Sequence, residues 1–192
     1  IYIVNNPMIN ALAAPGGYIV LMRGLLEQTN SPEELAGVLA HELQHVRRRH
    51  ATRILIQQAS MGLLLAAMTG NTSAATSYGL ETARTFGILH YSRRIEEEAD
   101  EDGMRMILDA RVDPNGIIKF FDTLKKKSAE IPSVFKYLST HPNTEERIQK
   151  LRAMAAGGRR KPTPLLKNLD WSAVKNICPE SGSSKANGDS HN

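Results

Sequence analysis

The residues most able to do chemistry are His41-Glu42-Leu43-Gln44-His45, an HExxH motif. In a helix, residues four apart lie on the same face, so both imidazoles can reach a single metal ion. Neutral imidazole nitrogen suits zinc, and the intervening Glu42 can act as a general base on water that the metal activates. The motif therefore predicts a zinc centre with His41 and His45 as ligands and hydrolytic chemistry at Glu42.

The surrounding sequence predicts a helix that carries this motif. Ser31-Pro32-Glu33-Glu34 combines an N-cap serine, a proline at the first helical position and a capping-box glutamate. We expect the helix to run from Ser31 to about residue 53. Glu42 falls within the apolar stripe of this helix, where a carboxylate is costly unless a group there needs it. A metal-bound water meets that need, whereas a purely structural zinc site leaves Glu42 unexplained.

A second predicted helix, about residues 80–110, supplies a candidate third ligand. Glu96 and Asp100 share one face of this helix, while their acidic neighbours project away from its centre. Glu96 is therefore the ligand candidate, and Asp100 is placed to accept a hydrogen bond from the outer nitrogen of a ligating histidine. The alternative is an acidic face in solvent, balanced by nearby arginines. We prefer that interpretation for Glu97, Glu98 and Glu101.

The rest of the chain indicates a mainly α fold (α+β) with a small N-terminal β-sheet. Short β-prone segments occur at residues 1–4, 10–14 and 18–21, and the last two flank a turn at Pro15-Gly16-Gly17. Further helices are expected at about 114–127 and 144–156. The apolar run 61–68 is too short to span a bilayer, so it predicts a buried helix segment, and no transmembrane helix is expected.

Length and composition narrow the function classes. With 192 residues, we expect a catalytic domain at 1–156. The tail, 157–192, is expected to hold a short docked helix at about 170–178, capped by Asp170, and then a disordered end. The single cysteine, Cys178, excludes an intrachain disulfide and a Cys-rich zinc module. The net charge of +4 is mild, and Arg47-Arg48-Arg49 is better explained as a solvated helix end than as a nucleic-acid contact.

Together these motifs resemble the zinc metallopeptidases of family 48, the gluzincins that include HtpX, BepA and the CAAX prenyl proteases. The HExxH motif, the segment 92–103, the upstream segment 10–17 and Thr140-His141-Pro142 with Arg147 occur in the family's order, over about residues 1–155. The resemblance implies a minimal gluzincin fold with an HExxH active-site helix and a second ligand helix. It also implies one zinc ion per chain.

The resemblance further implies roles for individual residues. Zinc would be bound by His41, His45 and Glu96. Glu42 would be general base and then proton donor, with Asp100 and Arg147 as supporting residues. His141 would lie near the metal, either as a gating fourth ligand or as a donor to the tetrahedral oxyanion. The edge strand that pairs with extended substrate would consist of Ala11, Leu12, Ala13 and Ala14.

The implied activity is that of a zinc endopeptidase acting on unfolded or misassembled proteins. HtpX and the prenyl proteases carry membrane-spanning helices, so the expected absence of one favours the soluble branch, located in the bacterial periplasm or cell envelope. Membrane association is expected only through a region before Ile1, and the sequence does not indicate an oligomeric state. The competing hypothesis is a zinc-bound, chaperone-like binding module whose protease activity is latent or gated by His141. His50 and His90 are interpreted as ordinary polar or packing histidines.

Overall fold

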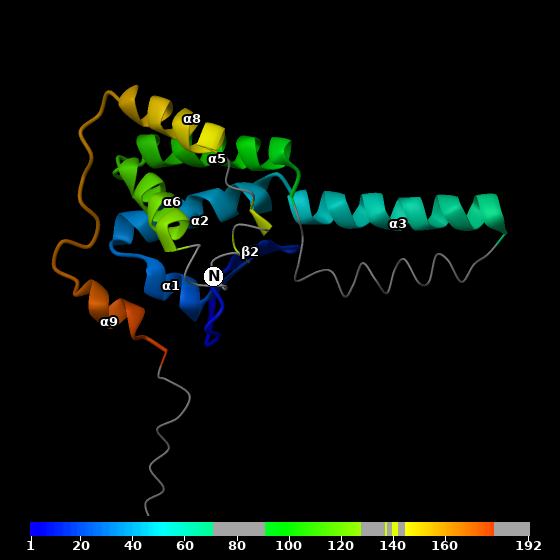
Figure 1. Cartoon of the computed structure of the whole chain (residues 1–192), viewed down its shortest axis with the longest axis horizontal. Helices are drawn as coiled ribbons and strands as arrows, with labels where there is room; N and C mark the ends of the chain where they lie inside the picture. Colours follow the sequence, from blue (N-terminus) through cyan, green and yellow to red (C-terminus); the bar gives the residue numbers. More distant parts are fainter. Residues whose placement is uncertain (71–90, 128–136, 138–139, 142–144, 179–192) are drawn as a thin grey trace, which may run out of the picture.

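The computed structural model describes residues 1–70, 91–127, 137, 140–141 and 145–178. Its centre is helix α2 (Pro32–Arg47), which packs against α5 (Arg93–Asp109) and α6 (Asn115–Lys127). Helix α8 (Glu145–Ala156) covers the outer side of α5 and α6 (Figure 1). The apolar core lies between these helices and a small sheet, which matches the mainly α prediction.

The N-terminal sheet has three short strands, β1 (Tyr2–Val4), β2 (Ala11–Ala14) and β3 (Tyr18–Met22), in the order β1-β3-β2. Strands β2 and β3 form the antiparallel hairpin that the sequence predicts, and β1 pairs with β3 in parallel. Gly16 and Gly17 turn the hairpin with φ of 88° and 91°, which glycine adopts without strain. Within this sheet, β2 is an edge strand that lies against α2.

Helix α2 starts as the sequence predicts and is held close to α6. The Ser31 side chain accepts a hydrogen bond from the backbone N–H of Glu34, which satisfies one free donor of the first turn. Gly37 faces α6, where a Cβ would lie 2.6 Å from Cβ of Ile117. The absent side chain therefore allows the two helices to approach closely.

The predicted extension of this helix to residue 53 is wrong. Helix α2 ends at Arg47, and a separate helix, α3 (His50–Thr69), begins after Arg49. Arg49 has φ of 54° and ψ of 37°, a left-handed conformation that cannot continue a right-handed helix. Two helical segments that follow one another without a proline or glycine look continuous in sequence.

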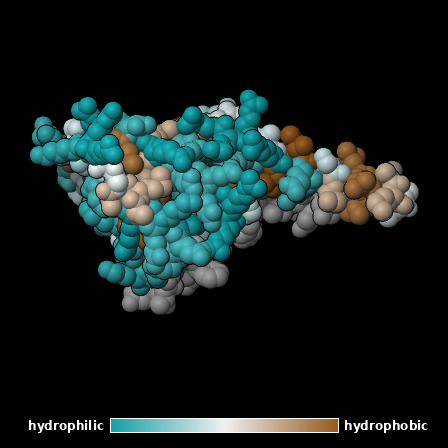
Figure 2. Space-filling model, turned by 90° about the horizontal axis from the view of Figure 1, so that it is seen from above, coloured by the Kyte–Doolittle hydropathy of each residue, from teal (hydrophilic) through white to brown (hydrophobic). Residues whose placement is uncertain are grey.

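The prediction that residues 61–68 are buried is also wrong, as is the expectation of no helix long enough to cross a membrane. Helix α3 projects away from the body (Figure 1), and most of its large apolar side chains are exposed (Figure 2). By length and composition it could cross a membrane, and only 11% of its most apolar window is buried. The count of uninterrupted apolar residues underestimated the length of this apolar helix, because Gln57 and Gln58 interrupt the run without adding charge.

The remaining helices agree with expectation over most of their described length. Helix α5 ends at Asp109 as predicted but begins only at Arg93, so the prediction is wrong for residues 91 and 92; its part before residue 91 lies outside the described residues. Helix α1 (Arg23–Gln28) was not predicted. Helix α9 (Trp171–Lys175) is capped by Asp170, and Trp171 Nε1 donates to the Thr29 carbonyl at 3.2 Å. The expected disordered end, after residue 178, lies outside the described residues, and the division at residue 156 stays a prediction.

Candidate metal centre

Helix α2 presents His41 and His45 one turn apart on its buried side. Their Nε2 atoms lie 3.0 Å apart, and both rings are almost completely buried. Two imidazole nitrogens that converge at this distance cannot both hold a proton without repulsion. Their arrangement suits two lone pairs directed at one cation.

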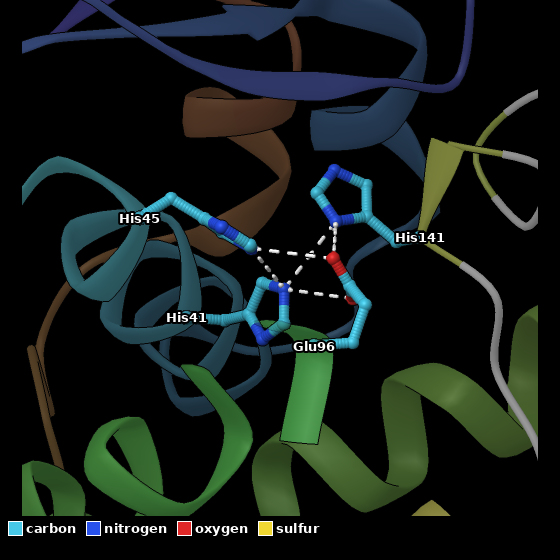
Figure 3. Close-up of side chains that lie close together, drawn as sticks. All are labelled: His41, His45, Glu96 and His141. Carbon is cyan, nitrogen blue, oxygen red and sulfur yellow. Dashed lines mark hydrogen bonds and ion pairs between the residues drawn. The ribbon is translucent and has the colours of Figure 1, made fainter. Parts of the chain in front are cut away.

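Two further groups reach the same point from other parts of the chain (Figure 3). Glu96, from the first turn of α5, places its carboxylate oxygens 3.4 Å from Nε2 of His41 and of His45. His141 places Nδ1 3.2 Å from Glu96 Oε1 and 3.4 Å from His41 Nε2. The ligand atoms of all four residues lie within 4.8 Å of one another, so they form one cluster.

Asp100 and Arg147 contact the cluster residues and hold them in place. Asp100 Oδ1 lies 2.9 Å from His41 Nδ1, one turn after Glu96, as the sequence predicts. This contact favours a proton on Nδ1 and leaves the Nε2 lone pair free for a metal. Arg147, from α8, donates to both oxygens of Asp100 at 2.6 and 2.9 Å and lies 3.0 Å from Glu96 Oε2. One buried guanidinium therefore fixes both carboxylates.

Two residues beside His45 were not singled out by the sequence. His50 was interpreted as an ordinary polar or packing histidine, yet its Nδ1 lies 2.9 Å from His45 Nδ1 and its ring is fully buried. The Tyr91 ring stacks on His45 with centroids 4.1 Å apart. Helical periodicity could not place His50, because the helix breaks at Arg49. His90 lies outside the described residues.

Glu42 lies next to the cluster without being part of it. Its side chain is 0% exposed, and among the described residues no side chain donates a hydrogen bond to either carboxylate oxygen. The nearest basic atom is His141 Nε2, 3.5 Å from Oε1. Burial raises the pKa of Glu42, and the nearby His141 and His41 offset only part of that shift. A carboxylate with a raised pKa accepts a proton more readily than an exposed glutamate does, which suits a general base.

The charges around the cluster fit a divalent cation. Three carboxyl groups are buried here, those of Glu42, Glu96 and Asp100, and the one buried guanidinium, that of Arg147, contacts Glu96 and Asp100. Burial alone would raise the pKa of Glu96, but His141 and His41 hold it well below its usual range. The Glu96 carboxylate therefore stays negatively charged although it is buried. Two or three imidazoles with one carboxylate form a typical zinc ligand set, so the residues present fit this ion.

A cavity of about 450 Å³ leads toward this site. It is bounded by the end of β2 and the following turn, by His45, and by the start of α3. The β2 edge and the ligand His45 thus face the same space. The sequence prediction of a substrate strand at Ala11–Ala14 is compatible with this placement, and its role stays a prediction.

An HExxH helix with a glutamate ligand from a second helix and a buried glutamate beside the ligands defines a metallopeptidase centre of the gluzincin type. The chain belongs to peptidase family M48, whose family model matches residues 1–155. This confirms the family resemblance, and zinc is the metal that the family and the ligand set imply.

The similarity to individual proteins agrees with this membership. The chain is 30% identical to the beta-barrel assembly-enhancing protease of Yersinia pestis, over 91% of this chain and 37% of the relative. It is 32% identical to a putative protease of the same name from Vibrio cholerae, over 88% and 37%. It is 32% identical to the mitochondrial metalloendopeptidase OMA1 of Schizosaccharomyces pombe, over 79% and 45%. The chain thus spans less than half the length of each of these relatives.

Proposed function

We propose that this chain is the catalytic part of a zinc-dependent endopeptidase. The observation that carries the proposal is the buried Glu42 carboxylate, which accepts no side-chain hydrogen bond from the described residues and lies beside a cluster of metal-ligand atoms. When bound, zinc supplies a Lewis acid that polarises the scissile carbonyl and lowers the pKa of water. His41, His45 and Glu96 would hold the ion.

The protein side chains would transfer the protons and stabilise the charge that develops in the reaction. Glu42 takes a proton from the attacking water and returns it to the leaving amine. His141, with Nε2 facing Glu42, is placed to donate to the developing oxyanion. Asp100 and Arg147 keep His41 in the tautomer whose Nε2 is free.

The proposed substrates are unfolded or misassembled polypeptides. Strand β2 is a sheet edge beside the cavity, and an edge strand binds extended chains through backbone hydrogen bonds without requiring a particular sequence. Two of the relatives are named for enhancing beta-barrel assembly. The proposed location, the bacterial periplasm or cell envelope, rests on the resemblance to these bacterial proteins.

The test is hydrolysis of casein by purified chain whose zinc content has been measured. We expect a chelator to abolish cleavage, and Glu42→Gln to abolish it at unchanged zinc content, because glutamine cannot take the proton. The matched control is Glu97→Gln, which changes a side chain of α5 that is 37% exposed, and it should cleave normally. Unchanged proteolysis by zinc-loaded Glu42→Gln would refute the assigned general base.

A specific observation also favours the second candidate, a zinc-bound binding module with latent protease activity. His141 contributes a nitrogen to the ligand cluster, and four protein ligands are typical of a closed, structural zinc site. If His141 gates the site, His141→Ala should raise casein cleavage. If His141 donates to the oxyanion, the same variant should lose cleavage while keeping its zinc.

A further inference from the structure

Helix α3 is a largely apolar helix of 20 residues, of which only His50, Ala51 and Gly62 are buried. Its distal half carries large exposed apolar side chains: Leu63 is 66% exposed, Leu64 54%, Leu65 37% and Met68 76%. It projects from the body beside the end of α2 (Figure 1). Figure 2 shows hydrophobic residues along this projection, whereas the visible face of the body is mostly hydrophilic.

The apolar character surrounds the helix rather than forming one stripe. Leu63, Leu64 and Leu65 are consecutive, so they point in three directions about 100° apart, and all three are exposed. A protein partner requires apolar residues on one face only. A helix that is apolar on all sides is suited to the hydrocarbon core of a lipid bilayer, which surrounds it with apolar groups.

The length of α3 is also compatible with insertion into a bilayer. The part of α3 beyond Arg53, residues 54–69, extends about 24 Å, which is most of the roughly 30 Å thickness of the hydrocarbon core of a bilayer. From residue 43 to residue 70 the sequence contains no aspartate or glutamate, and its uncharged polar residues, such as Gln57 and Ser60, are much cheaper to immerse than acids.

Positive charge is concentrated where α3 leaves the body. Arg47, Arg49 and Arg53 are exposed there, and none of the three forms an ion pair with a described residue. Arg48 differs, because it pairs with Glu98 and Asp102. Unpaired arginines at the base of an apolar helix are complementary to anionic lipid headgroups.

We propose that α3 inserts into a lipid bilayer, with Arg47, Arg49 and Arg53 at the headgroups. The cavity that His45 lines is also lined by Arg49, Ala51 and Thr52, which lie at the base of α3. Insertion therefore brings the entrance of the cavity to the membrane surface. If the proposed peptidase function holds, its substrates are polypeptide segments that lie at or emerge from that surface.

The first test is flotation of the full, zinc-loaded chain with phosphatidylcholine vesicles and with vesicles that also contain phosphatidylglycerol. We expect binding to both and tighter binding to the anionic mixture. Leu64→Glu should reduce the partition coefficient roughly 100-fold, as expected for a carboxylate placed in hydrocarbon. Arg53→Gln should remove part of the preference for anionic lipid. Leu169→Glu, an exposed leucine outside α3, is the matched control and should bind as the wild type does.

A second test locates the helix within the bilayer. Trp171, the only tryptophan, lies in α9 on the other side of the body (Figure 1), so it should not be quenched by brominated lipid. Leu64→Trp should be quenched strongly. Wild-type binding that Leu64→Glu leaves unchanged, or a lipid-free dimer that Leu64→Glu dissociates while no vesicle binding occurs, would overturn the proposal. Lipid binding is measured without substrate, so it can fail independently of the peptidase assignment.

Discussion

Arg147 is the residue whose removal should cost most stability outside the apolar core. Its guanidinium is 2% exposed and contacts two buried carboxylates, those of Asp100 and Glu96. Arg147→Met keeps the bulk of the stem but leaves both carboxylates without their cation. Breaking a buried ion pair from one side typically costs about 3–5 kcal/mol.

The magnitude is measurable by urea unfolding of metal-free protein, in which zinc cannot compensate for the lost charge. With a slope of about 2 kcal/mol per molar urea, the expected loss moves the midpoint down by about 1.5–2.5 M. Arg147→Lys keeps the charge but cannot form the forked contact with Asp100, so its midpoint should lie between those of the methionine variant and the wild type. It also provides a measurable protein if Arg147→Met does not fold.

The same helix offers a matched control. Arg152, also in α8, contacts both oxygens of Asp122 at 2.9 Å, but its side chain is 53% exposed. An exposed pair contributes about 0–1 kcal/mol, so Arg152→Met should move the midpoint by about 0.5 M or less. Equal midpoints for Arg147→Met and Arg152→Met would refute the argument that burial makes the difference.

Three further predictions concern zinc affinity and the stability of the fold. His50→Ala should weaken zinc binding about 10–100-fold in competition with a chelator, because His45 loses the partner of its outer nitrogen. Gly37→Ala should lower the unfolding free energy by about 1–3 kcal/mol in urea titration, because the new methyl group collides with Ile117. Trp171→Ala should lower the melting temperature, with a loss of roughly 2 kcal/mol, because the half-buried ring packs on the core and its N–H bonds Thr29. An unchanged melting temperature would show that α9 does not stabilise the body.

The sequence predicted those parts of the site that depend on helical periodicity or on short motifs. His41 and His45 share a turn, Glu96 and Asp100 share another, and both pairs lie where the period places them. The contact of Asp100 with His41 follows from the same geometry. The hairpin at Gly16-Gly17 and the cap at Asp170 are local in the chain, so local signals were sufficient.

The features that the sequence did not predict depend on tertiary structure or on one unusual backbone conformation. An arginine side chain does not predict a left-handed φ. The left-handed conformation of Arg49 nevertheless separates α2 from α3 and places His50 in contact with His45. The exposure of α3 could not be read from its apolar composition, because a buried helix has the same composition. The family resemblance supplied His141 and Arg147, which no spacing rule connects to residues 100 or 47 positions away.

The ligands of the metal centre come from distant parts of the chain, and this has a consequence for chain entropy. His41 and His141 are 100 residues apart, and Glu96 is 45 residues before His141. An ion held by His41, His45 and Glu96 would close the loop between residues 45 and 96, and His141 as a fourth ligand would close a second loop up to residue 141. Such a link removes many conformations from the unfolded ensemble, as a covalent cross-link does. Zinc bound at this centre would therefore stabilise the folded chain, by an amount that grows with the free zinc concentration.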